Sequence, residues 1–203
     1  MTTISGRVEQ KYTTYSWYIL FLGVMGPVGT AVKGQAMANQ EQYLDPVEIH
    51  PIDIVETLAE INAWAFDRVA DDQIAMAIEG AWRTYSITLA WSPHDETLRL
   101  VCSFEMDPPS ASLPGLFETL NSANDKCWTG AFTLWQEQKL MVYRYGLALT
   151  GGETAGPAQI SRIVQTAVAM CERFYPAFQL VCWGGESPRD AMRVAMDEAF
   201  GTA

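Results

Sequence analysis

The fold is decided by Trp82–Met106, which reads WRTYSITLAWSPHDETLRLVCSFEM. In Tyr85–Trp91 large apolar side chains alternate with small or polar ones, and the same period of two returns in Leu98–Met106. Alternation at that period is typical of a β-strand with one buried face. The segment Pro93-His94-Asp95-Glu96 between the two runs predicts a turn, so the stretch is expected to form two antiparallel strands.

Helices and further strands are predicted on both sides of this pair. Apolar residues at helical spacing indicate helices over Ile52–Trp64, over Leu113–Lys126 and from Pro157 onward. Pro176 is expected to kink or interrupt the third helix near Tyr175. Ser187 has the features of an N-cap for a last short helix that reaches Phe200.

The complete set of predicted strands is Phe66–Val69, Gln73–Ile78, Arg83–Trp91, Leu98–Met106, Trp128–Gln136 and Lys139–Leu149. The order of elements is then α-β-β-β-β-α-β-β-α-α. Such an order, without alternating βαβ units, predicts an α+β fold in which an antiparallel sheet is flanked by helices.

Composition limits the classes of partner. The chain has 203 residues, of which 49% are hydrophobic and 18% charged, with a formal net charge of −11. That composition is typical of a globular protein. The acidic charge repels nucleic-acid phosphates and anionic lipid headgroups, so neither is expected as a partner, whereas a basic segment of a client protein would be attracted.

The N-terminal region departs from the rest of the chain. We predict an extension over residues 1–42 and a single domain over residues 43–203. No charged residue lies between Lys11 and Lys33, and this segment has three interpretations: a secretory signal, a membrane anchor or a misassigned start of translation. We favour translation from Met37 and a cytoplasmic location. If residues 12–32 are present and retained, the protein is instead exported or anchored in a membrane.

Candidate catalytic groups are few. The only histidines are His50 and His94, and the neighbours Ser92 and Asp95 are too close in one turn to form a triad with His94. The four cysteines lack CxxC spacing and are expected to be reduced core residues. We therefore expect no catalytic residues, no cofactor and no metal site, and predict that the chain is not an enzyme.

Two surfaces are candidates for binding. The first is the face of the predicted strands that carries small or polar side chains; its residues are Thr84, Ser86, Thr88, Arg99 and Ser103. A protein partner could dock there, although antiparallel sheets also have faces of this kind that are simply exposed to solvent. The alternative, which would suit a small-ligand-binding protein or an enzyme, is a pocket between the sheet and the long helix lined by Tyr143, Arg144, Tyr145 and Trp183.

Several segments resemble the YbjN family of bacterial proteins, in particular its alphaproteobacterial branch. They are His50-Pro51-Ile52-Asp53, Glu79-Gly80-Ala81-Trp82-Arg83-Thr84-Tyr85, Trp91, Asn121, Trp128, Gly130, Tyr143-Arg144-Tyr145, Glu172-Arg173-Phe174-Tyr175-Pro176-Ala177-Phe178-Gln179 and Trp183. The resemblance covers roughly Tyr43 to Phe200. Since relatives begin shortly before the position of Tyr43, it also favours Met37 as the start.

The resemblance implies a fold like that of type III secretion chaperones and a role in regulation, with no family catalytic residues to carry over. Chaperones of that fold dimerise and hold extended client segments, which is an analogy between folds. The function predicted from the sequence is therefore a cytoplasmic, non-enzymatic regulatory protein, a homodimer that binds a protein partner through its sheet surface.

Overall fold

The computed structural model describes residues 49–197. The predictions for the N-terminal extension and for residues 198–203 lie outside this part. The described elements, in chain order, are α3 (Pro51–Ile61), β1 (Ala65–Ala70), β2 (Gln73–Glu79), β3 (Thr84–Ser92), β4 (Thr97–Glu105), η1 (Ser110–Ser112), α4 (Leu113–Asn124), β5 (Ala131–Trp135), β6 (Leu140–Ala148), α5 (Pro157–Gln179), η2 (Leu180–Gly184) and α6 (Pro188–Asp197). Apart from the short η1 and η2 turns, this is the predicted order, and the α+β class is confirmed.

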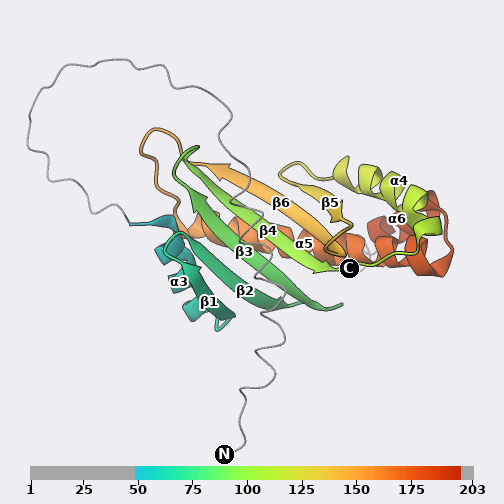
Figure 1. Cartoon of the computed structure of the whole chain (residues 1–203), viewed down its shortest axis with the longest axis horizontal. Helices are drawn as coiled ribbons and strands as arrows, with labels where there is room; N and C mark the ends of the chain where they lie inside the picture. The colour runs from blue at the N-terminus through green and yellow to red at the C-terminus, as the bar shows by residue number, and fades with distance from the viewer. Residues whose placement is uncertain (1–48, 198–203) are drawn as a thin grey trace, which may run out of the picture. The chain divides into compact units, whose positions relative to one another are not determined.

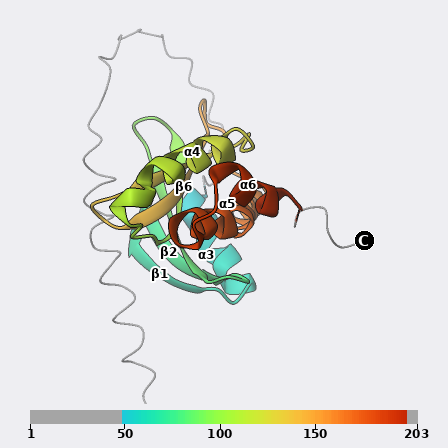
Figure 2. The same cartoon turned by 90° about the vertical axis from the view of Figure 1, so that its right-hand side faces the viewer.

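The six strands form one antiparallel sheet in the order β1-β2-β3-β4-β6-β5 (Figure 1). Helices α3 and α5 pack against one face of the sheet, which curves around α5 (Figure 2). Helix α4 lies beside β5 at one edge, and α6 packs on α4 and α5. None of the helices in the described part has the length and apolar character needed to cross a bilayer.

The alternation predicted for β3 and β4 produces the core. Ile87 lies opposite Cys102, and Cys102 lies opposite Tyr143. These three side chains form a row across three neighbouring strands, on the face of the sheet that packs against α5. Each is at most 1% exposed. Helix α5 meets this row with Cys171 and Phe174, which are fully buried. Burying an apolar side chain of this size stabilises the fold by about 1.5–3 kcal/mol.

Two helix termini show how local chemistry sets the boundaries. His50 caps α3, because its Nδ1 accepts a hydrogen bond from Ile52 N–H at 3.3 Å. Ser187 caps α6 as predicted: its Oγ accepts from Asp190 N–H at 3.2 Å and donates to Asp190 Oδ2 at 2.7 Å.

The predicted interruption of the long helix at Pro176 is wrong in position. Helix α5 continues to Gln179, and the winding changes only in η2, a π-helical turn over Leu180–Gly184. Proline removes one backbone hydrogen bond, but Ala177 and Phe178 just beyond it are fully buried. Their packing holds the chain in the helix past the missing bond.

Strand β5 is shorter than predicted, since it begins at Ala131 rather than Trp128. The chain after α4 continues as a turn, with hydrogen bonds from Lys126 N–H to Ala123 O and from Cys127 N–H to Asn124 O, both at 3.0 Å. Trp128 therefore lies in a loop with its side chain 96% exposed.

Candidate functional site

The structure places the five predicted surface residues on one face of the sheet. In the strand register Ser86 lies opposite Ser103, and Arg99 lies opposite Ala90. Thr84 and Thr88 lie two residues on either side of Ser86 and so point the same way. This face, which we call the open face, is opposite the face on which α3 and α5 pack, and within residues 49–197 no helix covers it (Figure 2).

The centre of the open face is neutral and closely packed. Thr88 is 5% exposed and Ser103 is 3% exposed, and the hydroxyl of Ser103 donates to Ser86 O at 3.5 Å. The neighbouring strands add Ala75 and Val142, which are also buried. These four side chains are therefore largely inaccessible, whereas Thr84 and Ser86 on the same face are partly exposed. None of these groups is a nucleophile activated by a base.

The open face also carries charged groups, among them Asp67, Arg99, Glu105 and Arg144. Arg99 Nη2 forms an ion pair with Asp95 Oδ2 at 2.7 Å. Hydrogen bonds from Ser92 and then from Arg99 hold the pKa of the Asp95 carboxyl below its usual value. Arg144 is exposed on the same face, where its Nη2 lies 3.4 Å from Thr133 Oγ1.

The four residues of the alternative pocket do not converge. Tyr143 and Tyr145 face the helices, whereas Arg144 between them points to the open face, because neighbours in a strand alternate. Tyr143 is 1% exposed and packs edge-on against Phe132 at 5.0 Å. Burial raises the pKa of its hydroxyl to about 12, so Tyr143 is neutral near pH 7. Trp183 belongs to η2 and is half exposed.

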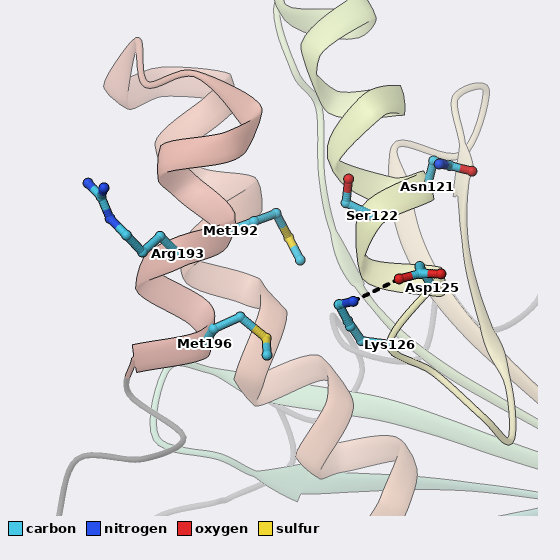
Figure 3. Close-up of a pocket in the computed structure, with 7 residues that line it drawn as sticks. All are labelled: Asn121, Ser122, Asp125, Lys126, Met192, Arg193 and Met196. Carbon is cyan, nitrogen blue, oxygen red and sulfur yellow. Dashed lines mark hydrogen bonds and ion pairs between the residues drawn. The ribbon is translucent and has the colours of Figure 1, made fainter.

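A groove of about 540 Å³ lies elsewhere, between α4 and α6. Its lining residues are Asn121, Ser122, Asp125, Lys126, Met192, Arg193 and Met196. Figure 3 shows both methionines directed toward α4, whereas Arg193 points away from it. Lys126 is paired with Asp125 at 2.8 Å. Two thioethers and one ion pair provide no general base or nucleophile.

The thiols and histidines of the described part also give no reactive centre. Cys102 and Cys171 approach each other to 3.6 Å between sulfurs and are fully buried. Burial raises the pKa of Cys171 well above its usual value, and raises the pKa values of Cys127 and Cys182 to about 11. All four cysteines are free. Among residues 49–197 no cluster of three or more His, Cys, Asp or Glu side chains could hold a metal ion.

A contact between the β2–β3 turn and α5 was not predicted from the sequence. We call it the aromatic corner, and its residues are Trp82, Arg83, Phe104, Glu172 and Tyr175. The Glu172 carboxylate accepts hydrogen bonds from Ala81 N–H at 2.9 Å and from Trp82 N–H at 3.4 Å. The Trp82 ring stacks on Tyr175 with centroids 6.3 Å apart and is 51% exposed.

Arg83 completes the aromatic corner. Its guanidinium lies over Phe104 at 5.5 Å and over Tyr175 at 5.8 Å, and its Nη1 donates to Glu105 O at 3.0 Å. These contacts join the turn to β4 and to α5. The sequence contained one indication of this site, because both segments that meet here, 79–85 and 172–179, are among those that resemble the family.

Comparison with known proteins agrees with that resemblance. The YbjN family model, described as "Putative bacterial sensory transduction regulator", matches residues 51–180. Among solved structures, a crystal structure of YbjN from E. coli, described as "a putative transcription regulator", matches with a TM-score of 0.43 and 13% identity. That match covers 73% of this chain and 92% of the other. No curated protein matches the sequence significantly.

Proposed function

We propose, since the chain belongs to the YbjN family, that it is a regulatory protein without catalysis of its own and acts by binding a protein partner through the open face. The family is described as one of regulators of sensory transduction. Partner binding by this chain, its location in the cytoplasm and its assembly as a homodimer are parts of the proposal.

The observation that carries the proposal is the composition of the open face. Strand β3 presents small, uncharged and partly exposed side chains at Thr84 and Ser86, and Ser86 lies in register with Ala77 on β2 and Ser103 on β4. A flat surface of this kind lets a second chain approach closely without desolvating a buried charge. The opposite face cannot serve in the same way, because Tyr143, Phe174 and Phe178 fill the space between the sheet and α5.

The same packing disfavours a second candidate function. A small-ligand site between the sheet and α5 would need room where these three aromatic side chains are buried, with Phe132 lying 5.8 Å from Phe174 and 5.3 Å from Phe178. The groove between α4 and α6 is lined by two thioethers and by an ion pair between Lys126 and Asp125, which provide no general base or nucleophile. We therefore put forward no enzymatic alternative.

The test maps the contact as well as detecting a partner. A photo-crosslinking amino acid at Ser86 in the full chain, expressed in the native host, should join to one partner, which mass spectrometry then identifies. With that partner purified, Thr84→Lys should weaken binding about tenfold or more, since it places a charge at the edge of the contact. Thr57→Lys is the matched control, because Thr57 is exposed on α3.

Unchanged affinity of the Thr84→Lys variant, or crosslinks that form equally well from Thr57, would show that the open face is not the docking surface. Recovery of crosslinks only within the chain itself, under conditions that capture known complexes of the host, would refute partner binding.

A further inference from the structure

Arg173 on α5 is a partly buried cation that has no oxygen acceptor within the described part of the chain. Its Nη2 contacts Met196 Sδ at 3.0 Å, and its Nε is buried without a hydrogen-bond partner. By contrast, Arg68 and Arg99 each form an ion pair with a carboxylate. A buried donor of a charged group is costly when no acceptor meets it, so the environment of Arg173 lacks a partner.

The two nitrogens concerned lie on the same edge of the guanidinium group. In this planar group Nε–H and one N–H of Nη2 point in the same direction, and a carboxylate accepts both hydrogen bonds at once. In Arg173 the contact of Nη2 is instead with the Met196 thioether, which is a weak acceptor. The missing partner therefore has the chemistry of a carboxylate.

Arg173 lies directly behind the groove between α4 and α6. Met196, which contacts the guanidinium, also lines this groove of about 540 Å³, and Figure 3 shows its side chain directed toward α4. Met196 is partly exposed, and its unbranched side chain has three rotatable bonds. A ligand in the groove can thus reach Arg173 once this one side chain moves. The volume lies within the range of about 300–1,000 Å³ that is usual for small-molecule sites.

The charges around the groove favour an anion with a single negative charge. Asp125 and Lys126 pair with each other at 2.8 Å. Arg193 points away from α4 in Figure 3 and lies 3.4 Å from Asp190. Of the charged groups described around the groove, this leaves Arg173 as the uncompensated one. One carboxylate neutralises one guanidinium, whereas a phosphate group would bring up to two negative charges to it.

We propose that Arg173 and the groove between α4 and α6 form a binding site for a small monocarboxylate with an apolar chain. The carboxylate accepts hydrogen bonds from Nε and Nη2 in place of Met196 Sδ. The apolar chain lies along the thioethers of Met192 and Met196, which adapt to irregular apolar shapes. This site is distinct from the open face, so the proposal goes beyond the function proposed above and each can fail without the other.

The experiment is isothermal titration calorimetry of the full chain with sodium octanoate as the probe. The two comparison probes are 1-octanol, which has the same chain without the charge, and inorganic phosphate. Octanoate should bind about tenfold or more tightly than either, because only octanoate combines a bidentate carboxylate with an apolar chain. The methyl signals of Met192 and Met196 in carbon-13 NMR spectra should shift on addition of octanoate.

Two pairs of variants locate the carboxylate. Arg173→Met removes the charge and should weaken octanoate binding about tenfold or more. Its matched control is Arg162→Met, at an exposed position of the same helix, which should leave the affinity unchanged. Met196→Glu places a carboxylate of the chain itself beside Arg173 and should abolish octanoate binding, whereas the uncharged Met196→Gln should retain it. The Met196 pair tests the site even if Arg173→Met does not fold.

Four results would overturn the proposal. They are absence of octanoate binding to the unsubstituted chain, equally tight binding of 1-octanol or phosphate, unchanged affinity in folded Arg173→Met, and equal affinities of Met196→Glu and Met196→Gln.

Discussion

The close approach of Gly80 to Glu172 allows a quantitative prediction for the aromatic corner. A Cβ atom at Gly80 would overlap Glu172 Oε1 and would lie 2.6 Å from Tyr85 Cε2. Gly80→Ala should therefore displace the carboxylate, which would lose its hydrogen bonds to Ala81 N–H and Trp82 N–H. The backbone of Gly80 has no positive φ, so the cost arises from this contact and not from backbone strain.

The magnitude follows from the two parts of the contact. Overpacking in a closely packed site costs about 1–3 kcal/mol. Hydrogen bonds to a charged acceptor contribute about 1.5–3 kcal/mol, and we take the lower end because water can reach the turn amides. Gly80→Ala should thus lower the free energy of unfolding by about 3 kcal/mol, and Glu172→Ala alone by about 1.5 kcal/mol.

A double-mutant cycle separates this explanation from a general loss of stability. In the Glu172→Ala background the new methyl group meets only the Tyr85 ring, so Gly80→Ala should cost about 1 kcal/mol, which gives a coupling energy of about 2 kcal/mol. Urea unfolding of the four chains, followed by circular dichroism, measures these values. Gly146→Ala is the control: its Cβ would lie 3.4 Å from Thr97 Cγ2, and the expected change is within about 0.5 kcal/mol. Equal costs of Gly80→Ala with and without Glu172 would refute the reasoning.

Three further predictions concern the rest of the domain. Arg68 bridges β1 to α3 through Asp53 at 2.6 Å and Glu56 at 2.7 Å. Arg68→Met should lower the free energy of unfolding by about 0.5–1 kcal/mol at low salt and by less in concentrated salt. An equal loss at both salt concentrations, measured by urea unfolding, would contradict an electrostatic role. Burial raises the pKa of Tyr143 to about 12, whereas tyrosine in an unfolded chain titrates near 10. The unfolded chain then releases this proton first, so the free energy of unfolding should fall as pH rises from about 10 to 12. Tyr143→Phe should reduce that loss of stability, as measured by unfolding followed by circular dichroism. An unchanged dependence of stability on alkaline pH in this variant would contradict the prediction. Cys127 is the one partly exposed cysteine in the described part. A thiol-reactive disulfide reagent should therefore modify Cys127 first in the native chain, which mass spectrometry can measure. Earlier modification of one of the buried cysteines would contradict the described packing.

The sheet could be predicted because its signal is local. The alternation in β3 and β4 is visible residue by residue, and the register then follows from the turn at Pro93–Glu96. The short β5 could not be predicted in length, because nothing in the sequence between Trp128 and Ala131 marks where pairing with β6 begins. At Gly130 the chain passes so close to β6 that a Cβ atom there would lie 2.8 Å from Arg144 O. The glycine permits this approach, but which strand it approaches depends on the partner and cannot be read from the local pattern.

The surfaces were predictable only in part. Residues that share a strand face, such as Thr84, Ser86 and Thr88, follow from a period of two. The aromatic corner joins Ala81 to Glu172 across 91 residues, and no periodicity links positions so far apart. Asn124 is a single polar residue at the end of a helix, where asparagine usually serves as a helix cap or is exposed to solvent. Its hydrogen bonds with the backbone of Phe132 depend on how α4 packs beside the sheet.

The π-helical turn η2 has a consequence for how the domain tolerates changes in length. In this turn Gly185 N–H donates to Leu180 O, five residues back, and Cys182 O accepts from Ser112 Oγ at 3.0 Å. The turn thus holds one residue more than an α-helical path would need. Deleting one residue from Leu180–Gly184 would return the turn to an α-helical path and shift the loop that leads into α6. The position of α6 against α4, and with it the groove between them, therefore depends on the number of residues in this turn as much as on their identity.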